Sequence, residues 1–152
     1  APQPGFSETA LVAWESKQDE TRTAVTKIRR GQAFFRDMIL TSYRGKCALT
    51  GVDDSRLLNA SHIIGWQEDV NLRLNPTNGI CLNALHDRAF DRHLISFDDD
   101  YRMIIAADIP PETKKILSRG IHSQIKLPEK FLPDPAFLDH HRQRMQARST
   151  AA

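Results

Sequence analysis

His62, Asp87 and Asp91, within residues 61–91, are of the types that could cut a phosphodiester. His62 follows a short apolar run, and Asp87 and Asp91 are four residues apart, so on a helix they project from one face. Two such carboxylates repel unless a cation lies between them, and Mg²⁺ takes one or two carboxylates together with water and phosphate oxygens. A neutral histidine can remove a proton from water near neutral pH. These residues together predict metal-assisted hydrolysis.

Each residue also has a purely structural interpretation. Asp91 could cap the turn after the helix, and Asp87 could pair with Arg88 or Arg92. A single histidine beside apolar residues is more often a satisfied core residue than a base. The combination of residues, rather than any one of them, favours a catalytic site.

The sequence pattern predicts the elements that would position these residues. Residues 11–28 hold good helix formers, and the apolar residues of 34–39 continue the helical spacing. The segment "GKCALTG", 45–51, would end this helix and close a short extended stretch. Residues 57–64 predict a strand and 65–79, rich in Asn, Gly and Pro, predict a loop. Residues 80–91 would begin extended and become helical near Asn83, with Leu85, Ala89 and Phe90 on the apolar side.

The later part of the chain predicts a hairpin and two helices. Residues 94–107 form two apolar runs around an acidic turn. Residues 110–120 have Pro near the start and Gly at the end, and Asp134 followed by Pro135 reads as the start of a last helix. The fold class expected is therefore α+β.

Length and composition limit the protein class. A chain of 152 residues with 40% hydrophobic residues suits one compact domain. No apolar run approaches the roughly 20 residues that cross a bilayer, so no membrane partner is expected. The start lacks the regions of a signal peptide, and Cys47 and Cys81 suit free, buried thiols. We therefore expect a cytoplasmic protein.

The positive charge is concentrated near the start of the chain. Residues 21–46 carry seven basic groups against the single acid Asp37, which gives +6 in a chain whose net charge is +2. Such a face suits a polyanion, since affinity for nucleic acid rests largely on phosphate neutralisation. Solvated helix faces would give the same count.

Four segments in order, "CALTG", "ASHIIGW", "NPTNGICLN" and "HDRAFDRHLISFDDD", resemble the HNH endonuclease superfamily, and within it a bacterial restriction-endonuclease-like subfamily. The resemblance covers about 29–106, leaving 1–28 as linker and helix and 107–152 as a C-terminal helical extension. It implies a ββα-metal core with flanking helices and an additional β-hairpin. It also implies cleavage of double-stranded DNA with one divalent cation, Mg²⁺ or Mn²⁺.

The resemblance assigns roles residue by residue. His62 corresponds to the general base that activates water, and Asn78 to the middle asparagine that ties the loop together. Asp87 corresponds to the metal ligand of the last motif, and Asp91 to a second ligand found in some relatives. His86 would be the ligand instead if the helix began one residue out of register.

Two departures from the family pattern stand out. Many relatives carry an Asp or His ligand immediately before the base, whereas this chain has Ser61, which could bind metal only weakly or through water. Many relatives also hold a structural zinc in two C-x-x-C knuckles. Here Cys47 and Thr50 stand for the first, and the second is expected to be replaced by apolar residues around Leu82 and Leu85. No structural zinc is therefore expected.

Contacts to DNA would be mainly to phosphates, which position a protein without reading sequence. Arg36 could equally brace the core through a salt bridge. The candidate DNA-binding residues are Arg30, Arg36, Arg44, Lys46, Arg73, Arg88 and Arg92.

Nothing in the sequence supplies a module that reads a target sequence. Residues 1–9 look like a linker, so a target-recognition domain elsewhere in a longer chain is expected. Cutting both strands would need two passes or two copies, which makes a homodimer one partner to consider. The competing function is a catalytically inactive DNA-binding module with an HNH-like fold, which Ser61 favours. A purely structural domain would leave the basic stretch unexplained.

Overall fold

The computed structural model describes residues 7–151, and the chain divides into two units between residues 33 and 34. Residues 1–6, in the expected linker, lie outside the described residues. Helix α1 (Glu8–Ser42) is continuous through the boundary. Within the first unit it is the single described element, and nearly all of its side chains are exposed. No helix among residues 7–151 is long and apolar enough to cross a membrane.

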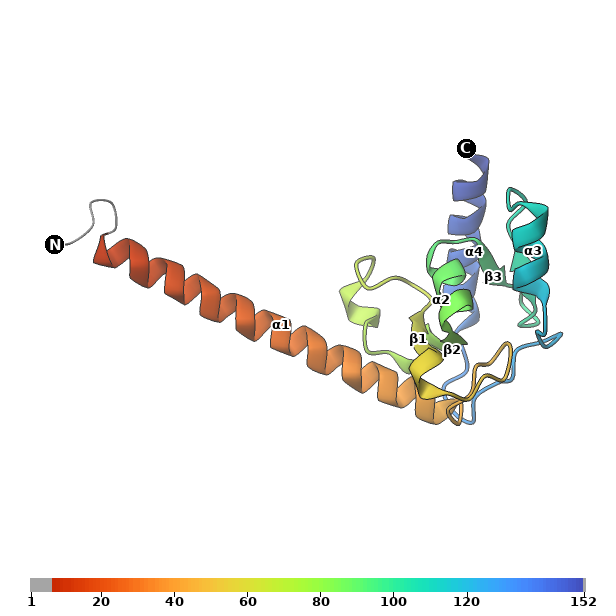
Figure 1. The fold of residues 1–152 in the computed structure, drawn as a ribbon, viewed down its shortest axis with the longest axis horizontal. Helices are drawn as coiled ribbons and strands as arrows, with labels where there is room; N and C mark the ends of the chain where they lie inside the picture. The colour runs from red at the N-terminus through yellow and green to blue at the C-terminus, as the bar shows by residue number, and fades with distance from the viewer. Residues whose placement is uncertain (1–6, 152) are drawn as a thin grey trace. The chain divides into compact units, whose positions relative to one another are not determined.

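The second unit contains a ββα motif (Figure 1). Strands β1 (Leu58–His62) and β2 (Gly79–Asn83) pair antiparallel with no bulge, from Leu58 opposite Asn83 to His62 opposite Gly79. Helix α2 (Ala84–Asp91) follows β2 without a connecting residue and packs against both strands. The order strand, loop, strand, helix therefore places the end of β1 and the face of α2 near one another.

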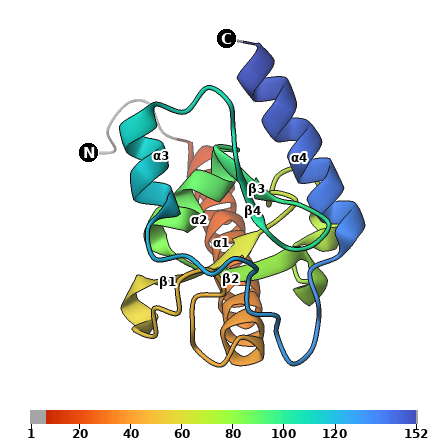
Figure 2. The same ribbon diagram turned by 90° about the vertical axis from the view of Figure 1, so that its right-hand side faces the viewer.

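A second hairpin and two helices complete this unit. Strands β3 (Ile95–Phe97) and β4 (Met103–Ile105) pair antiparallel around the acidic turn. Figure 2 shows them between α3 (Pro111–Ser118) and α4 (Pro135–Thr150). The Asp134 carboxylate accepts a hydrogen bond from the Ala136 backbone N–H at 2.8 Å, which caps α4 as the sequence predicts. The expected α+β class is confirmed.

The core of the second unit is apolar and draws on helices α1 to α4 and on strands β1, β2 and β3. Phe35 and Ile39, from the last turns of α1, contact β2, and Phe90 of α2 meets Phe97 of β3 with ring centroids 5.5 Å apart. Both cysteines are buried and free, as expected. The fully buried apolar residues include Phe35, Ile39, Leu49, Leu58, Ile80, Leu82, Phe90, Ile95, Phe97, Leu117 and Leu138.

Two local expectations are wrong. Residues 45–51 form turns rather than an extended stretch, because the Gly51 N–H donates to the Cys47 carbonyl and the Cys47 N–H to that of Val52. On α2, Leu85 is 51% exposed, while His86 is buried with Ala89 and Phe90. A polar contact described below turns this helix face inward at His86.

Replacing Gly79 by alanine should destabilise the second unit. A Cβ there would lie 2.5 Å from Cζ of Phe35 and 2.7 Å from Cδ1 of Ile39, and overpacking a tight core costs about 1–3 kcal/mol. Urea unfolding measures the loss. Gly65→Ala is the control, because its Cβ would meet only the flexible Glu68 side chain. Equal stability of the two variants would contradict the packing described.

Candidate active site

His62 lies at the end of β1 with its ring held on three sides. It stacks on Phe35 with centroids 3.9 Å apart and 12° between planes, and Trp66 meets it edge-on. Its Nε2 lies 2.8 Å from the Arg73 carbonyl oxygen. A carbonyl can only accept, so Nε2 carries the proton and donates it. The Nδ1 atom is thereby left as the basic nitrogen, and no partner bonds to it among residues 7–151.

The surroundings favour the neutral form of this histidine. Burial lowers the pKa of His62, whereas the bond to the Arg73 carbonyl and the charge of Asp87 raise it, and the net shift is downward from 6.5. His62 is therefore neutral near pH 7. A neutral imidazole with a lone pair on Nδ1 can act as a general base.

Asn78 ties together the loop that carries Arg73. Its Oδ1 accepts from the Ile64 N–H at 2.8 Å, and its Nδ2 donates to the carbonyls of Ile64, at 3.0 Å, and Leu72, at 3.3 Å. The side chain is completely buried, so these bonds replace those it would make with water. Both ends of the loop are joined at one amide. The carbonyl that orients His62 is therefore fixed from within the loop.

The Asp87 carboxylate faces β1. Its Oδ1 accepts from the Ser61 hydroxyl at 2.5 Å and its Oδ2 accepts from Nδ2 of Asn59 at 2.9 Å. Residues two apart on a strand point to the same face, so β1 presents both donors to α2. Ion pairs of Asp87 with Arg88 or Arg92, an alternative left open by the sequence, do not occur in the described structure. Sequence reasoning missed Asn59, whose only signal is this two-residue spacing from Ser61.

Asp91 and His86 differ in their surroundings. Asp91 lies one turn beyond Asp87 on α2 and is exposed. His86 is 3% exposed; its Nε2 donates to the Leu117 carbonyl at 2.8 Å, and its Nδ1 lies 2.9 Å from Nδ2 of Asn83. Both ring nitrogens are therefore engaged inside the protein. In the structure His86 therefore lies in the interior, bonded to α3 and to Asn83.

A hydrogen-bonded polar cluster occupies the positions of the two zinc knuckles. Residues 47 and 50 form one C-x-x-T pair, and Asn83 and His86 form the second pair at the same spacing. The Cys47 sulfur accepts hydrogen bonds from the backbone N–H of Thr50 and from the backbone N–H and the side-chain Nδ2 of Asn83, at 3.3–3.4 Å. The expectation that apolar residues around Leu82 and Leu85 replace the second knuckle is therefore wrong.

The cluster's chemistry does not suit a metal. Burial raises the pKa of the Cys47 thiol, but hydrogen bonds from Thr50 and Asn83 outweigh burial and the net shift is downward. An amide and a hydroxyl are poor zinc ligands beside one thiol and one histidine whose nitrogens are engaged. Within residues 7–151 no group of three or more His, Cys, Asp or Glu side chains could hold a metal ion.

Three of the predicted DNA-binding residues are engaged within the protein. Arg36 donates to the Leu58 carbonyl at 2.6 Å and to that of Ser55 at 2.8 Å, so it braces the core through carbonyls rather than a salt bridge. Arg44 pairs with Glu129. The Arg73 guanidinium donates to the Trp66 carbonyl and lies 4.6 Å from that ring's centroid. The others, all exposed and without an acidic partner in the described part of the chain, are Arg30, Lys46, Arg88 and Arg92.

Comparisons with known proteins show what the chain is similar to in sequence and in fold. Residues 47–98 match a family model described as "HNH endonuclease". A solved structure described as "Modification dependent TagI restriction endonuclease" is similar in fold, with a TM-score of 0.52 and 16% sequence identity. The match covers 72% of this chain and 36% of that one, so the chain spans about a third of that protein's length. No curated protein sequence matches the chain significantly.

The polar cluster predicts a fold that is stable without zinc and sensitive to Asn83. A chelator should leave the free energy of unfolding unchanged, whereas Asn83→Ala should lower it by about 2 kcal/mol, because a helix cap and the side-chain bond to Cys47 are lost. Urea titrations with and without chelator measure both effects.

Asn83→Asp serves as the matched variant. It keeps the oxygen that caps α2 and removes the amide that donates to Cys47, Thr50 and His86, so it should lie between wild type and Asn83→Ala. One tightly bound zinc per chain, with unfolding on chelation, would show that the cluster holds a metal.

Proposed function

Since residues 47–98 match the model of the HNH endonuclease family, we propose that this chain hydrolyses phosphodiester bonds of double-stranded DNA with the help of one divalent cation. The observation that carries the proposal is the geometry of His62. Its Nε2 proton is fixed on the Arg73 carbonyl, its Nδ1 is left as a base, and Asp87 lies on the facing helix.

The proton transfer follows from that geometry. As a water oxygen bonds to phosphorus, Nδ1 of His62 takes the water proton. The bond from phosphorus to the leaving sugar oxygen breaks, and this oxygen keeps the bonding electrons and takes a proton from solvent. The imidazole becomes positively charged in this step. Its Nε2–H bond to the Arg73 carbonyl then becomes charge-assisted and strengthens, which favours the transition state over the ground state.

The residues present fit a hard divalent cation. Each oxygen of Asp87 accepts one hydrogen bond from β1 and keeps a further lone pair, and Asp91 offers an exposed carboxylate one turn away. Oxygen ligands of this kind suit Mg²⁺ or Mn²⁺. When bound, the ion stabilises negative charge on the phosphate. We assign Ser61 and Asn59 as positioning residues, because they hold the Asp87 carboxylate toward β1.

Binding would rest on phosphate contacts from exposed basic side chains. In the second unit these are Lys46, Arg88 and Arg92. Such contacts are salt-dependent and carry little sequence information. We propose that target choice lies in a separate recognition domain, since the similar restriction endonuclease is far longer than this chain. We also propose a restriction-type role, which the likeness in fold to that endonuclease supports.

His62→Ala should lower DNA cleavage by about 10²–10⁴-fold and leave DNA binding unchanged, because the base is lost while phosphate contacts remain. A plasmid-nicking assay measures cleavage, and a gel-shift assay measures binding. Wild-type cleavage should rise with pH to a plateau, and the midpoint of the rise should lie below the ordinary histidine value of 6.5, because burial lowers the pKa of His62 and only the neutral form is a base. His122→Ala, at a partly buried histidine in the segment after α3 and outside the site, is the histidine control. Wild-type nicking by His62→Ala would remove this residue from the mechanism, and binding without nicking by wild type would favour the inactive binder.

Asp87→Asn should abolish Mg²⁺- or Mn²⁺-dependent nicking, and Asp91→Ala should raise the metal concentration required. His86→Ala should lower stability and keep metal binding, because its nitrogens bond to Leu117 and Asn83. Calorimetric titration with Mn²⁺ measures metal binding, and the melting temperature of each variant measures stability, so the two kinds of loss can be told apart. Asp53→Asn, at an exposed aspartate outside the site, is the control. Loss of metal in His86→Ala with retention in Asp87→Asn would reverse the assignment.

A further inference from the structure

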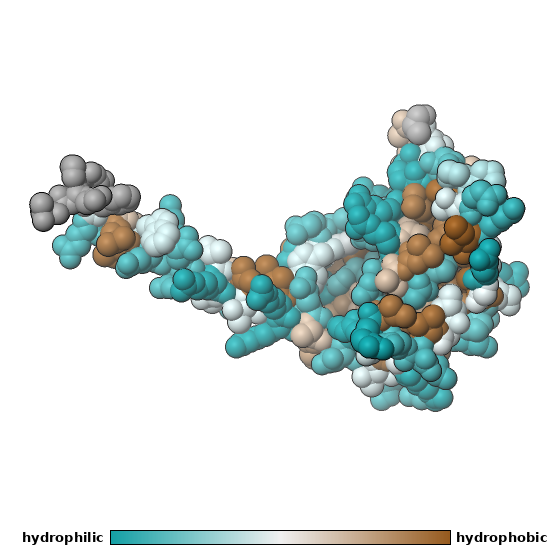
Figure 3. Space-filling view, in the orientation of Figure 1, coloured by the Kyte–Doolittle hydropathy of each residue, from teal (hydrophilic) through white to brown (hydrophobic). Residues whose placement is uncertain are grey.

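An exposed apolar stripe runs along α1 in the first unit. Leu11, Trp14, Val25 and Ile28 are between 39% and 60% exposed, and Figure 3 shows hydrophobic patches separated by polar surface along this helix. Two polar residues, Gln18 and Thr21, complete this series. Its spacing alternates between three and four residues, at positions 11, 14, 18, 21, 25 and 28. That alternation is the heptad spacing of the a and d positions in a coiled coil.

Nothing within the first unit covers the stripe. Its described residues, 7–33, form one helix, and no second element of that unit packs against it. An isolated helix gains most of its stability from burying one face, and an exposed tryptophan and three aliphatic residues leave that gain unrealised. A partner helix with the same repeat would supply it.

We propose that residues 8–32 pair with the same residues of a second copy as an antiparallel two-stranded coiled coil. In the register that places Leu11 opposite Ile28 of the second copy, Trp14 lies opposite Val25 and Gln18 opposite Thr21. Apolar positions then meet apolar positions, and the polar positions meet each other at the centre. A central polar layer of this kind specifies register in coiled coils.

Charge complementarity selects the same orientation. The e positions beside the stripe are Glu8, Glu15, Arg22 and Arg29. In the antiparallel pair Glu8 lies near Arg29 and Glu15 near Arg22 of the second copy, so every flanking pair on this side is of opposite charge. A parallel pair would instead bring Lys17 against Arg22. Within the helix Arg22 forms an ion pair with Asp19 at 3.7 Å, and both side chains are highly exposed. Arg22 can therefore leave Asp19 for a carboxylate of the second copy at little cost.

This inference rests on residues 8–32 and does not depend on the nuclease chemistry. A dimer of this kind would carry two copies of the second unit. Both strands of one duplex could then be cut without release, which a single copy achieves only by binding twice.

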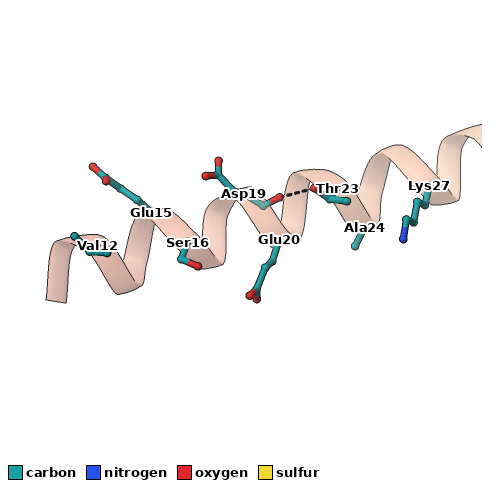
Figure 4. A pocket seen from close by; sticks show the side chains of 8 residues that line it. All are labelled: Val12, Glu15, Ser16, Asp19, Glu20, Thr23, Ala24 and Lys27. Carbon is teal, nitrogen blue, oxygen red and sulfur yellow. Dashed lines mark hydrogen bonds between the residues drawn. The ribbon is translucent and has the colours of Figure 1, made fainter. Parts of the chain in front are cut away.

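Sedimentation equilibrium of the whole chain tests the association. We expect twice the monomer mass of 17.3 kDa, falling toward the monomer on dilution. Val25→Glu should give a monomer, because it places a charge in the stripe. Val12→Glu is the matched control: it makes the same change at an exposed valine on the adjacent polar face, with Ser16, Asp19 and Thr23 (Figure 4). It should remain a dimer.

Charge reversal and cross-linking test the orientation. Arg22→Glu should weaken the dimer about tenfold, and adding Glu15→Arg should restore it. A Gln18→Cys chain mixed with a Thr21→Cys chain should form more cross-linked dimer than either chain alone. Three results would overturn the proposal: a wild-type monomer at all concentrations, equal effects of the two valine substitutions, or cross-linking confined to like chains.

Discussion

The side chain of Asn83 is the contact on which the ββα motif depends. Its Oδ1 accepts from the N–H groups of Leu85 and His86 and so starts α2 directly at the end of β2. Its Nδ2 reaches Cys47 and Thr50 in the turn after α1. One amide thus joins a turn, a strand and a helix that are up to 36 residues apart in the chain. The direction of α2, and with it the position of Asp87, follows from this junction.

A hydrogen-bonded junction is far weaker than a metal centre, and the rest of the unit is built accordingly. A structural zinc contributes about 10–16 kcal/mol to a small domain, whereas a hydrogen bond contributes about 1 kcal/mol net. The difference has to come from apolar burial. The last turns of α1 and the helices α3 and α4 provide it, since Phe35, Leu117 and Leu138 are all within 2% of full burial. The flanking helices are therefore part of what keeps the motif folded.

Strand β1 positions both halves of the candidate site. Asn59 and Ser61 hold the Asp87 carboxylate, and the next residue, His62, carries the base. The loop that follows is closed by Asn78, whose side chain has every bond inside the protein. Groups held on a strand and locked by buried hydrogen bonds lose little entropy on reaching a productive geometry. This arrangement therefore holds the base and the carboxylate in place before the substrate binds.

Local patterns predicted the elements, because periodicity, turn residues and caps act between near neighbours. The strand at 57–64, the helix after Asn83 and the cap at Asp134 were all correct for this reason. Polar partners far apart in the chain were missed. The sequence shows that Asn59 and Asn83 are amides but not that they meet Asp87 and Cys47. The burial of His86 in place of Leu85 has the same origin. Hydropathy favours leucine, but His86 bonds both to the Leu117 carbonyl and to the Asn83 amide, which a leucine side chain cannot do. Hydropathy alone therefore decides the buried face of a helix only where no buried polar group requires a partner.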